Sequence, residues 1–99
     1  MKRLMPEILQ AVAAEDYKVY AYMNDGTVHL YDAAPLLKEP KGVFRNIADP
    51  TAFRERLTVM NGTIAWDIEG SRNERKCIDI DPFTVYESPV VKDPLEEME

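Results

Sequence analysis

The alternation of apolar and polar residues predicts a β-hairpin near the start of the chain. Apolar side chains recur at every second position in Tyr17–Met23 and again in Thr27–Asp32, which is the period of a half-buried strand. Between the two runs, Asp25-Gly26 favours a two-residue type I′ turn, because this turn needs positive φ at both central residues.

The register of this predicted hairpin sorts its side chains onto two faces. A two-residue turn pairs Met23 with Val28, and the pairing continues outwards from there. The face expected to pack in the core is aliphatic and consists of Val19, Ala21, Met23, Val28 and Leu30. The opposite face is aromatic and consists of Tyr20, Tyr22, His29 and Tyr31.

The same signals predict further strands and several short helices. Asn61-Gly62 is a second two-residue turn signal, and its register places Leu57, Val59, Ile64 and Trp66 on one face. The other predicted strands are Ile8–Ala14, Thr58–Met60, Thr63–Trp66 and Cys77–Ile80. Short helical segments are predicted at Ala33–Leu37, at Val43–Ile47, from Pro50 to Arg56 and after Asp81-Pro82, where an Asp cap precedes a Pro as it does at Asp49-Pro50.

These elements predict an α+β fold made of antiparallel hairpins and two or three short helices. A chain of 99 residues is enough for one domain and one core, and too short for a separate deep cleft. We expect residues 1–88 to form the domain. Residues 89–99 are acidic and contain Pro89 and Pro94, so we expect a flexible tail.

Charge and cysteine content narrow the function classes. The net charge is −6, and most of the excess comes from the last seven residues, which hold four carboxylates and no Lys or Arg. The chain therefore lacks the basic face that is typical of nucleic-acid binding. Cys77 is the only cysteine, so the chain has no disulfide of its own and a cytoplasmic setting is the simplest interpretation. Neither a secretory signal nor a membrane span is predicted.

No residue set predicts an enzyme or a cofactor site. His29 is the sole histidine and would need an orienting carboxylate to act as a general base, but strand alternation places Asp32 on the opposite face. A metal site would need the set Asp79, Asp81, Glu87 and Cys77, whose spacing matches no EF-hand loop and no zinc pattern. We therefore expect no catalytic residues, no metal and no cofactor.

A short basic stretch is a further candidate site. Arg72, Arg75 and Lys76, with Glu74 among them, would suit a phosphate or the carboxylates of a partner. The simpler interpretation is a solvated polar loop.

The predicted aromatic face has three interpretations. The helices expected at 33–37 and 50–56 would cover it, or it would bind a protein partner or a second copy, or it would line a small-ligand site. Tyrosine is enriched at interfaces because it combines a large area with little rotamer entropy and a hydroxyl that tolerates water.

Several short motifs resemble those of a bacterial family known as domain of unknown function 2442. The matching segments are Tyr17-Lys18-Val19, Asp25-Gly26-Thr27, Tyr31-Asp32, Pro35-Leu36-Leu37, Gly42-Val43-Phe44, Asp49-Pro50, Phe53, Asn61–Trp66 and Ile80–Glu87. They cover about residues 7–87 in order, and Asp67–Lys76 departs from the pattern of many members, which have a shorter link there.

The resemblance implies a small α+β domain with an antiparallel sheet and no assigned reaction. Some relatives are fused to a helix-turn-helix domain or are encoded beside another small protein in a toxin–antitoxin-like arrangement. Only 12 residues follow Glu87 here, too few for a helix-turn-helix, so DNA binding is not implied.

The function we expect is therefore that of a cytoplasmic, non-enzymatic domain that binds a protein partner or a second copy of itself. The contact would be made through Tyr20, Tyr22, His29 and Tyr31. A small-ligand or enzymatic site on the same face is the alternative, and a nucleic-acid accessory role for Arg72, Arg75 and Lys76 is the third.

Overall fold

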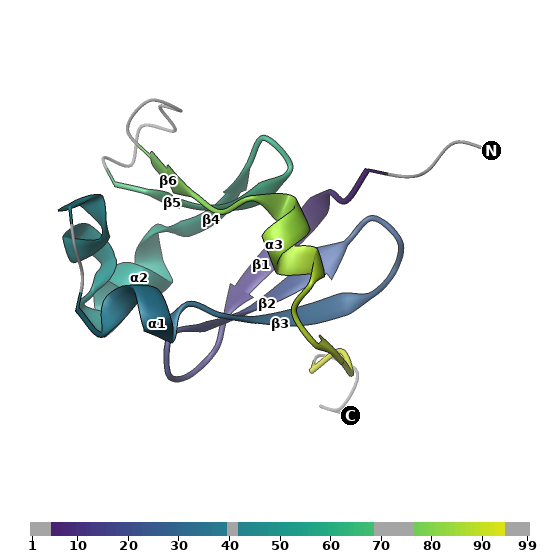
Figure 1. The fold of residues 1–99 in the computed structure, drawn as a ribbon, viewed down its shortest axis with the longest axis horizontal. Coiled ribbons are helices and arrows are strands. Elements are labelled where there is room, and N and C mark those ends of the chain that lie inside the picture. Colours follow the sequence, from purple (N-terminus) through teal and green to yellow (C-terminus); the bar gives the residue numbers. More distant parts are fainter. Residues whose placement is uncertain (1–4, 40–41, 69–76, 95–99) are drawn as a thin grey trace.

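Two antiparallel sheets form the frame of the fold (Figure 1). The structure is a computed structural model that describes residues 5–39, 42–68 and 77–94. The first sheet has the order β1-β2-β3-β7, with strands at Ile8–Ala13, Lys18–Met23, Val28–Asp32 and Val90–Val91. The second has the order β4-β5-β6, with strands at Leu57–Met60, Thr63–Asp67 and Cys77–Asp79. The predicted α+β class is confirmed.

The helices are short, and two of them begin where the sequence predicts. They are α1 at Ala34–Leu37, the 3₁₀-helix η1 at Gly42–Ile47, α2 at Pro50–Arg56 and α3 at Pro82–Tyr86. The side chain of Asp49 accepts from the Ala52 N–H, and that of Asp81 accepts from the Phe83 N–H. Figure 1 shows α1 and α2 together at one end of the molecule, while α3 packs near β3. In the described residues, no helix has the length and apolar character to cross a membrane.

The core lies between the two sheets and the helices. Trp66 of β5 is fully buried, its ring lies 5.3 Å from that of Phe53 in α2, and its Nε1–H donates to the Phe53 carbonyl at 3.1 Å. Val85 of α3 and Val19 of β2 belong to the same buried cluster. Burial of such side chains is the main stabilising contribution to a domain of this size.

The Asn61-Gly62 turn agrees with its prediction. Both residues have positive φ, 54° and 73°, and Leu57 pairs with Trp66 while Val59 pairs with Ile64. The predicted register of this hairpin is therefore confirmed.

The register predicted for the first hairpin is wrong by one residue. Tyr22 pairs with Val28 and Ala21 pairs with His29, so the loop holds three residues, with Gly26 at φ 87°. The Gly26 N–H bonds the Met23 carbonyl at 3.1 Å, and the Met23 N–H bonds the Thr27 carbonyl at 2.9 Å. A tight turn followed by one glycine with positive φ is the common three-residue hairpin loop. It leaves Asp25 with an ordinary negative φ, whereas the two-residue turn requires positive φ at Asp25 as well.

The shift separates the four residues of the predicted aromatic face. Tyr20 and Tyr22 lie on one face of the sheet, together with Val28 and Leu30, because successive side chains of a strand alternate between faces. His29 and Tyr31 lie on the other face, with Val19, Ala21 and Met23. The aromatic face predicted from the sequence is therefore not a single surface, and Val28 and Leu30 do not share a face with Val19.

The flexible tail was predicted to begin at residue 89, but residues 89–91 belong to the folded part of the chain. Val90–Val91 forms β7 and pairs with Val28 and His29, and the Leu30 N–H donates to the Pro89 carbonyl at 2.9 Å. Backbone hydrogen bonds to the edge of β3 hold this segment.

The turn between β1 and β2 has an unusual backbone. Asp16 and Tyr17 have φ values of 59° and 60°, a region that bulky L-residues rarely occupy. The side chain of Tyr17 holds the turn in place. Its hydroxyl donates to the Ala48 carbonyl, and its ring packs edge-on against Phe53 at 5.2 Å.

Candidate interaction surface

The four-stranded sheet has one face in the core and one face outside it. The outer face carries Val12 from β1, Tyr20 and Tyr22 from β2, and Leu30 from β3, where Val12 pairs with Tyr20 and Tyr20 with Leu30. All four side chains are half-buried. The buried cluster and the residues packed against it include none of them. We call Val12, Tyr20, Tyr22 and Leu30 the outer face.

The composition of the outer face is unusual for a surface of an antiparallel sheet. Such sheets commonly bury one apolar face and present polar side chains to water on the other. Here the outer side of β2 and β3 is apolar or aromatic at Tyr20, Tyr22, Val28 and Leu30, and the charged pair Lys18 and Asp32 lies at one end of it. Contiguous exposed apolar surface on a small domain marks a binding site more often than isolated apolar residues do.

Two of the predicted contact residues, Tyr20 and Tyr22, lie on this face. Val12 and Leu30 were missed, and Leu30 was assigned to the core. If Asn24-Asp25-Gly26 is interpreted as a three-residue loop, the register pairs Leu30 with Tyr20 and so predicts Leu30 on the outer face. The Tyr22 hydroxyl donates to Asp93 Oδ1 at 2.7 Å, so the end of the described chain lies beside the outer face.

His29 lies inside the fold and has structural partners. It is 3% exposed, its Nδ1–H donates to the Ser88 carbonyl at 2.8 Å, and its Nε2 lies 2.9 Å from Thr27 Oγ1. Tyr31 is half-buried and packs against the core, and burial, with a smaller contribution from Asp32, raises its pKa. Both residues thus lie on the core side of the sheet, on the face opposite Tyr20 and Tyr22.

A polar cluster of Asp25, Thr27, His29 and Tyr86 joins the hairpin loop to α3. Asp25 Oδ1 accepts from the Thr27 hydroxyl at 2.5 Å and from the Thr27 N–H at 3.0 Å. Asp25 Oδ2 accepts from the Tyr86 hydroxyl at 2.8 Å. The bonds from Thr27, then that from Tyr86, lower the pKa of Asp25 to about 2, and the bond to Asp25 raises the pKa of Tyr86.

Within the polar cluster, the Thr27 hydroxyl beside His29 resembles a catalytic nucleophile beside its base, but only in part. A catalytic hydroxyl must give its proton to the base, but the single hydroxyl proton of Thr27 is donated to Asp25. The Thr27 hydroxyl proton is thus directed at Asp25 and not at His29. The arrangement serves to fasten α3 to the loop.

A hollow of about 460 Å³ lies at one end of the outer face, beside the β1–β2 turn. It is lined by Ala14, Glu15, Asp16, Lys18, Tyr20 and Leu30. Tyr20 and Leu30 belong both to this hollow and to the outer face, so the two are continuous. We call it the turn hollow.

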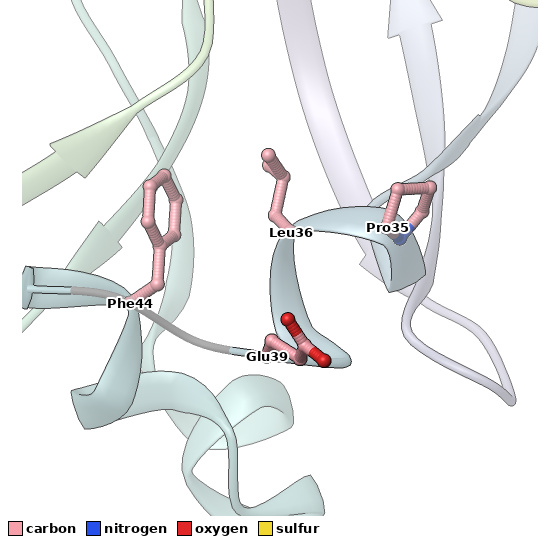
Figure 2. Close-up of a pocket in the computed structure, with 4 residues that line it drawn as sticks. All are labelled: Pro35, Leu36, Glu39 and Phe44. Carbon is pink, nitrogen blue, oxygen red and sulfur yellow. The ribbon is translucent and has the colours of Figure 1, made fainter.

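A second hollow, of about 350 Å³, lies between α1 and η1 and is lined by Pro35, Leu36, Glu39 and Phe44. Figure 2 shows the side chains of Leu36 and Phe44 on either side of this space, with Glu39 below Leu36 in this view. Leu36 and Phe44 also pack against the core, which is sufficient to explain their positions.

Other predicted sites are not brought together. Among residues 5–39, 42–68 and 77–94, no group of three or more His, Cys, Asp or Glu side chains is arranged to hold a metal ion. Arg72, Arg75 and Lys76 lie outside the described residues.

Comparisons with protein-family models, with curated proteins and with solved structures found no match for this chain. The resemblance to domain of unknown function 2442 therefore stays a prediction from the sequence.

Proposed function

We propose that this chain is a non-enzymatic protein-interaction domain that binds its partner through the outer face. The observation that carries the proposal is the position of Val12, Tyr20, Tyr22 and Leu30 on three adjacent strands and outside the buried cluster. Binding at such a face is favourable because the partner removes apolar surface from water.

The non-enzymatic part of the proposal rests on how the titratable side chains are used. His29 is bonded on both ring nitrogens within the fold, and the Thr27 hydroxyl is committed to Asp25. A cytoplasmic setting and a partner of the toxin–antitoxin-like kind are parts of the same proposal. The first is supported by the single cysteine, the second by the family resemblance.

The test combines partner capture with a count of subunits. The chain serves as bait in a lysate of its native cell, and light scattering measures its oligomeric state. We expect the native chain to retain a protein or to self-associate, and the double variant Tyr20→Ser/Leu30→Ser to lose that contact. The control is Phe83→Ser, which removes an exposed ring (49%) on α3, away from the outer face.

Retention of the same partner by Tyr20→Ser/Leu30→Ser would overturn the proposal, provided that circular dichroism shows the variant to be folded. So would a monomeric chain that retains no protein.

A small-ligand role is the second candidate, because the turn hollow has a volume within the range of about 300–1,000 Å³ that is typical of ligand sites. A ligand-induced rise in melting temperature that is lost in Leu30→Ser, in a chain that binds no protein, would favour this candidate.

A further inference from the structure

Two carboxylates lie in the turn hollow without a partner of their own. Glu15 and Asp16 are exposed and line the hollow. In the described parts of the chain, neither side chain makes a hydrogen bond or an ion pair. Their charges are therefore available to a ligand that enters the hollow.

The charge balance of the hollow is negative. Among the described residues that line it, Lys18 is the one cation, beside the carboxylates of Glu15 and Asp16, and Lys18 pairs across the strands with Asp32 of β3. Two lining carboxylates thus stand against one ammonium group, and the whole chain carries a net charge of −6. A second copy of this chain would bring like charges together, whereas a cationic group would be attracted.

The turn that carries the carboxylates is fixed before any ligand binds. Tyr17 anchors it through the bond to Ala48 and the contact with Phe53, and the Ala33 N–H donates to the Tyr17 carbonyl at 2.9 Å. A site that is ordered in advance loses less conformational entropy when it binds.

The apolar wall and the acidic rim of the hollow meet at one place. Tyr20 and Leu30 provide the wall and lead directly onto the outer face. A single lysine or arginine side chain suits this combination, because its aliphatic stem covers apolar surface while its charged end reaches the carboxylates.

We propose that the occupant of the outer face is a protein segment carrying a lysine or arginine beside an aliphatic residue, with the cationic side chain in the turn hollow. This inference rests on the proposed function, since it names the chemistry of the partner that the outer face would bind.

The test is an NMR titration of the ¹⁵N-labelled chain with N-acetyl-leucyl-arginine amide. The matched probe replaces arginine by citrulline, which has nearly the same shape and no charge. We expect the arginine probe to shift the amide signals of residues 14–20 and of Leu30. Binding should be about three- to tenfold weaker for the citrulline probe, as expected when one or two exposed ion pairs are lost.

The decisive variant is the double substitution Glu15→Gln/Asp16→Asn. Both replacements keep the shape of the side chains, and asparagine tolerates the positive φ of position 16, so the turn should be retained. We expect this variant to bind the arginine probe as weakly as the native chain binds the citrulline probe. The control Glu39→Gln, in the hollow between α1 and η1, should bind like the native chain.

Equal binding of the two probes, no binding of the arginine probe, or no effect of Glu15→Gln/Asp16→Asn would overturn the inference. The proposed function would still stand if Tyr20→Ser/Leu30→Ser abolished partner binding. If Tyr20→Ser/Leu30→Ser still bound both the partner and the arginine probe, the proposed function would be overturned as well.

Discussion

The ring of Tyr86 lies against the ring of His29, with 4.9 Å between the ring centroids and 33° between the ring planes. Tyr86 also donates its hydroxyl to Asp25 at 2.8 Å, and His29 donates to the Ser88 carbonyl. The end of α3 is therefore attached to the first hairpin by one ring contact and two hydrogen bonds. Substitutions at Tyr86, Asp25 and His29 can therefore test the polar cluster.

Replacing Tyr86 by Phe should keep the ring contact and remove the bond to Asp25. We expect the pKa of Asp25, which is about 2, to rise toward its ordinary 3.8 without reaching it, because the two bonds from Thr27 are larger causes of the shift. Carbon-detected NMR titration of the carboxyl group measures this change. Tyr20→Phe, on the outer face, is the matched control and should leave Asp25 unchanged, whereas an unchanged Asp25 in Tyr86→Phe would contradict the geometry.

Asp25 should make the stability of the fold depend on pH at the acid end. Its pKa is lower in the folded chain, about 2, than its ordinary 3.8. Its contribution to the free energy of unfolding is therefore present above pH 3.8 and lost as the pH falls through about 2. Asp25→Asn should flatten the curve in this interval, as measured by urea unfolding at a series of pH values. Since Asp25 is exposed, solvent screening keeps the effect small.

Leu9→Ala, at an exposed side chain that carries no titratable group, is the control for the same experiment. It should leave the slope between about pH 4 and pH 2 as it is in the native chain. An identical slope in Asp25→Asn and the native chain would show that the polar cluster does not favour the ionised form.

Replacing His29 by Ala should destabilise the fold strongly for a single side chain. The change leaves the Ser88 carbonyl without its partner and removes a ring that is 3% exposed. The expected loss is about 1–3 kcal/mol in the free energy of unfolding, the usual result of leaving a buried polar group unpaired. Urea unfolding measures it, and Leu9→Ala, at a side chain that is 61% exposed, should change stability by at most about 0.5 kcal/mol. Similar values for the two variants would argue against a buried, bonded His29.

The loop of the first hairpin can be tested at Gly26, whose φ is 87°. An added Cβ meets no atom within 4 Å, so the effect of Gly26→Ala comes from the backbone alone. We expect a loss of about 1–2 kcal/mol. Gly26→Asn should lose less, because asparagine visits this region more readily. If both variants unfolded at the same urea concentration as the native chain, Gly26 would not have a positive φ in solution.

Local signals predicted the ends of the helices and the second hairpin well, because neighbouring residues determine these features. Asp49 accepts from the Ala52 N–H and Asp81 from the Phe83 N–H, each in the first turn of its helix, and Asn61 and Gly62 both adopt positive φ. No distant contact is needed for either result.

The first hairpin could not be settled by the same reasoning. Asn24-Asp25-Gly26 is compatible with a two-residue turn or with a three-residue loop, and the local difference between them is that Asp25 needs positive φ only in the two-residue turn. The structure supports the three-residue loop with contacts from elsewhere in the chain. The Asn24 side chain bonds Met5 and its N–H bonds Glu7, while Tyr86 bonds Asp25. The candidate site inherited this error, so Tyr20 and Tyr22 were placed with His29 and Tyr31. Pairing of β7 with β3 was missed because two residues carry no detectable period.

The three-residue loop has a consequence for how this protein could diversify. Side chains alternate along β3, so a slip of one residue that paired Met23 with Val28 instead of Thr27 would bring His29 and Tyr31 beside Tyr20 and Tyr22 and turn Val28 and Leu30 toward the core. Such a slip would alter the recognition chemistry of the sheet without replacing any residue in a strand. In a set of related chains, the pairing register next to this one loop would then separate two binding specificities more sharply than the identity of the residues in the sheet.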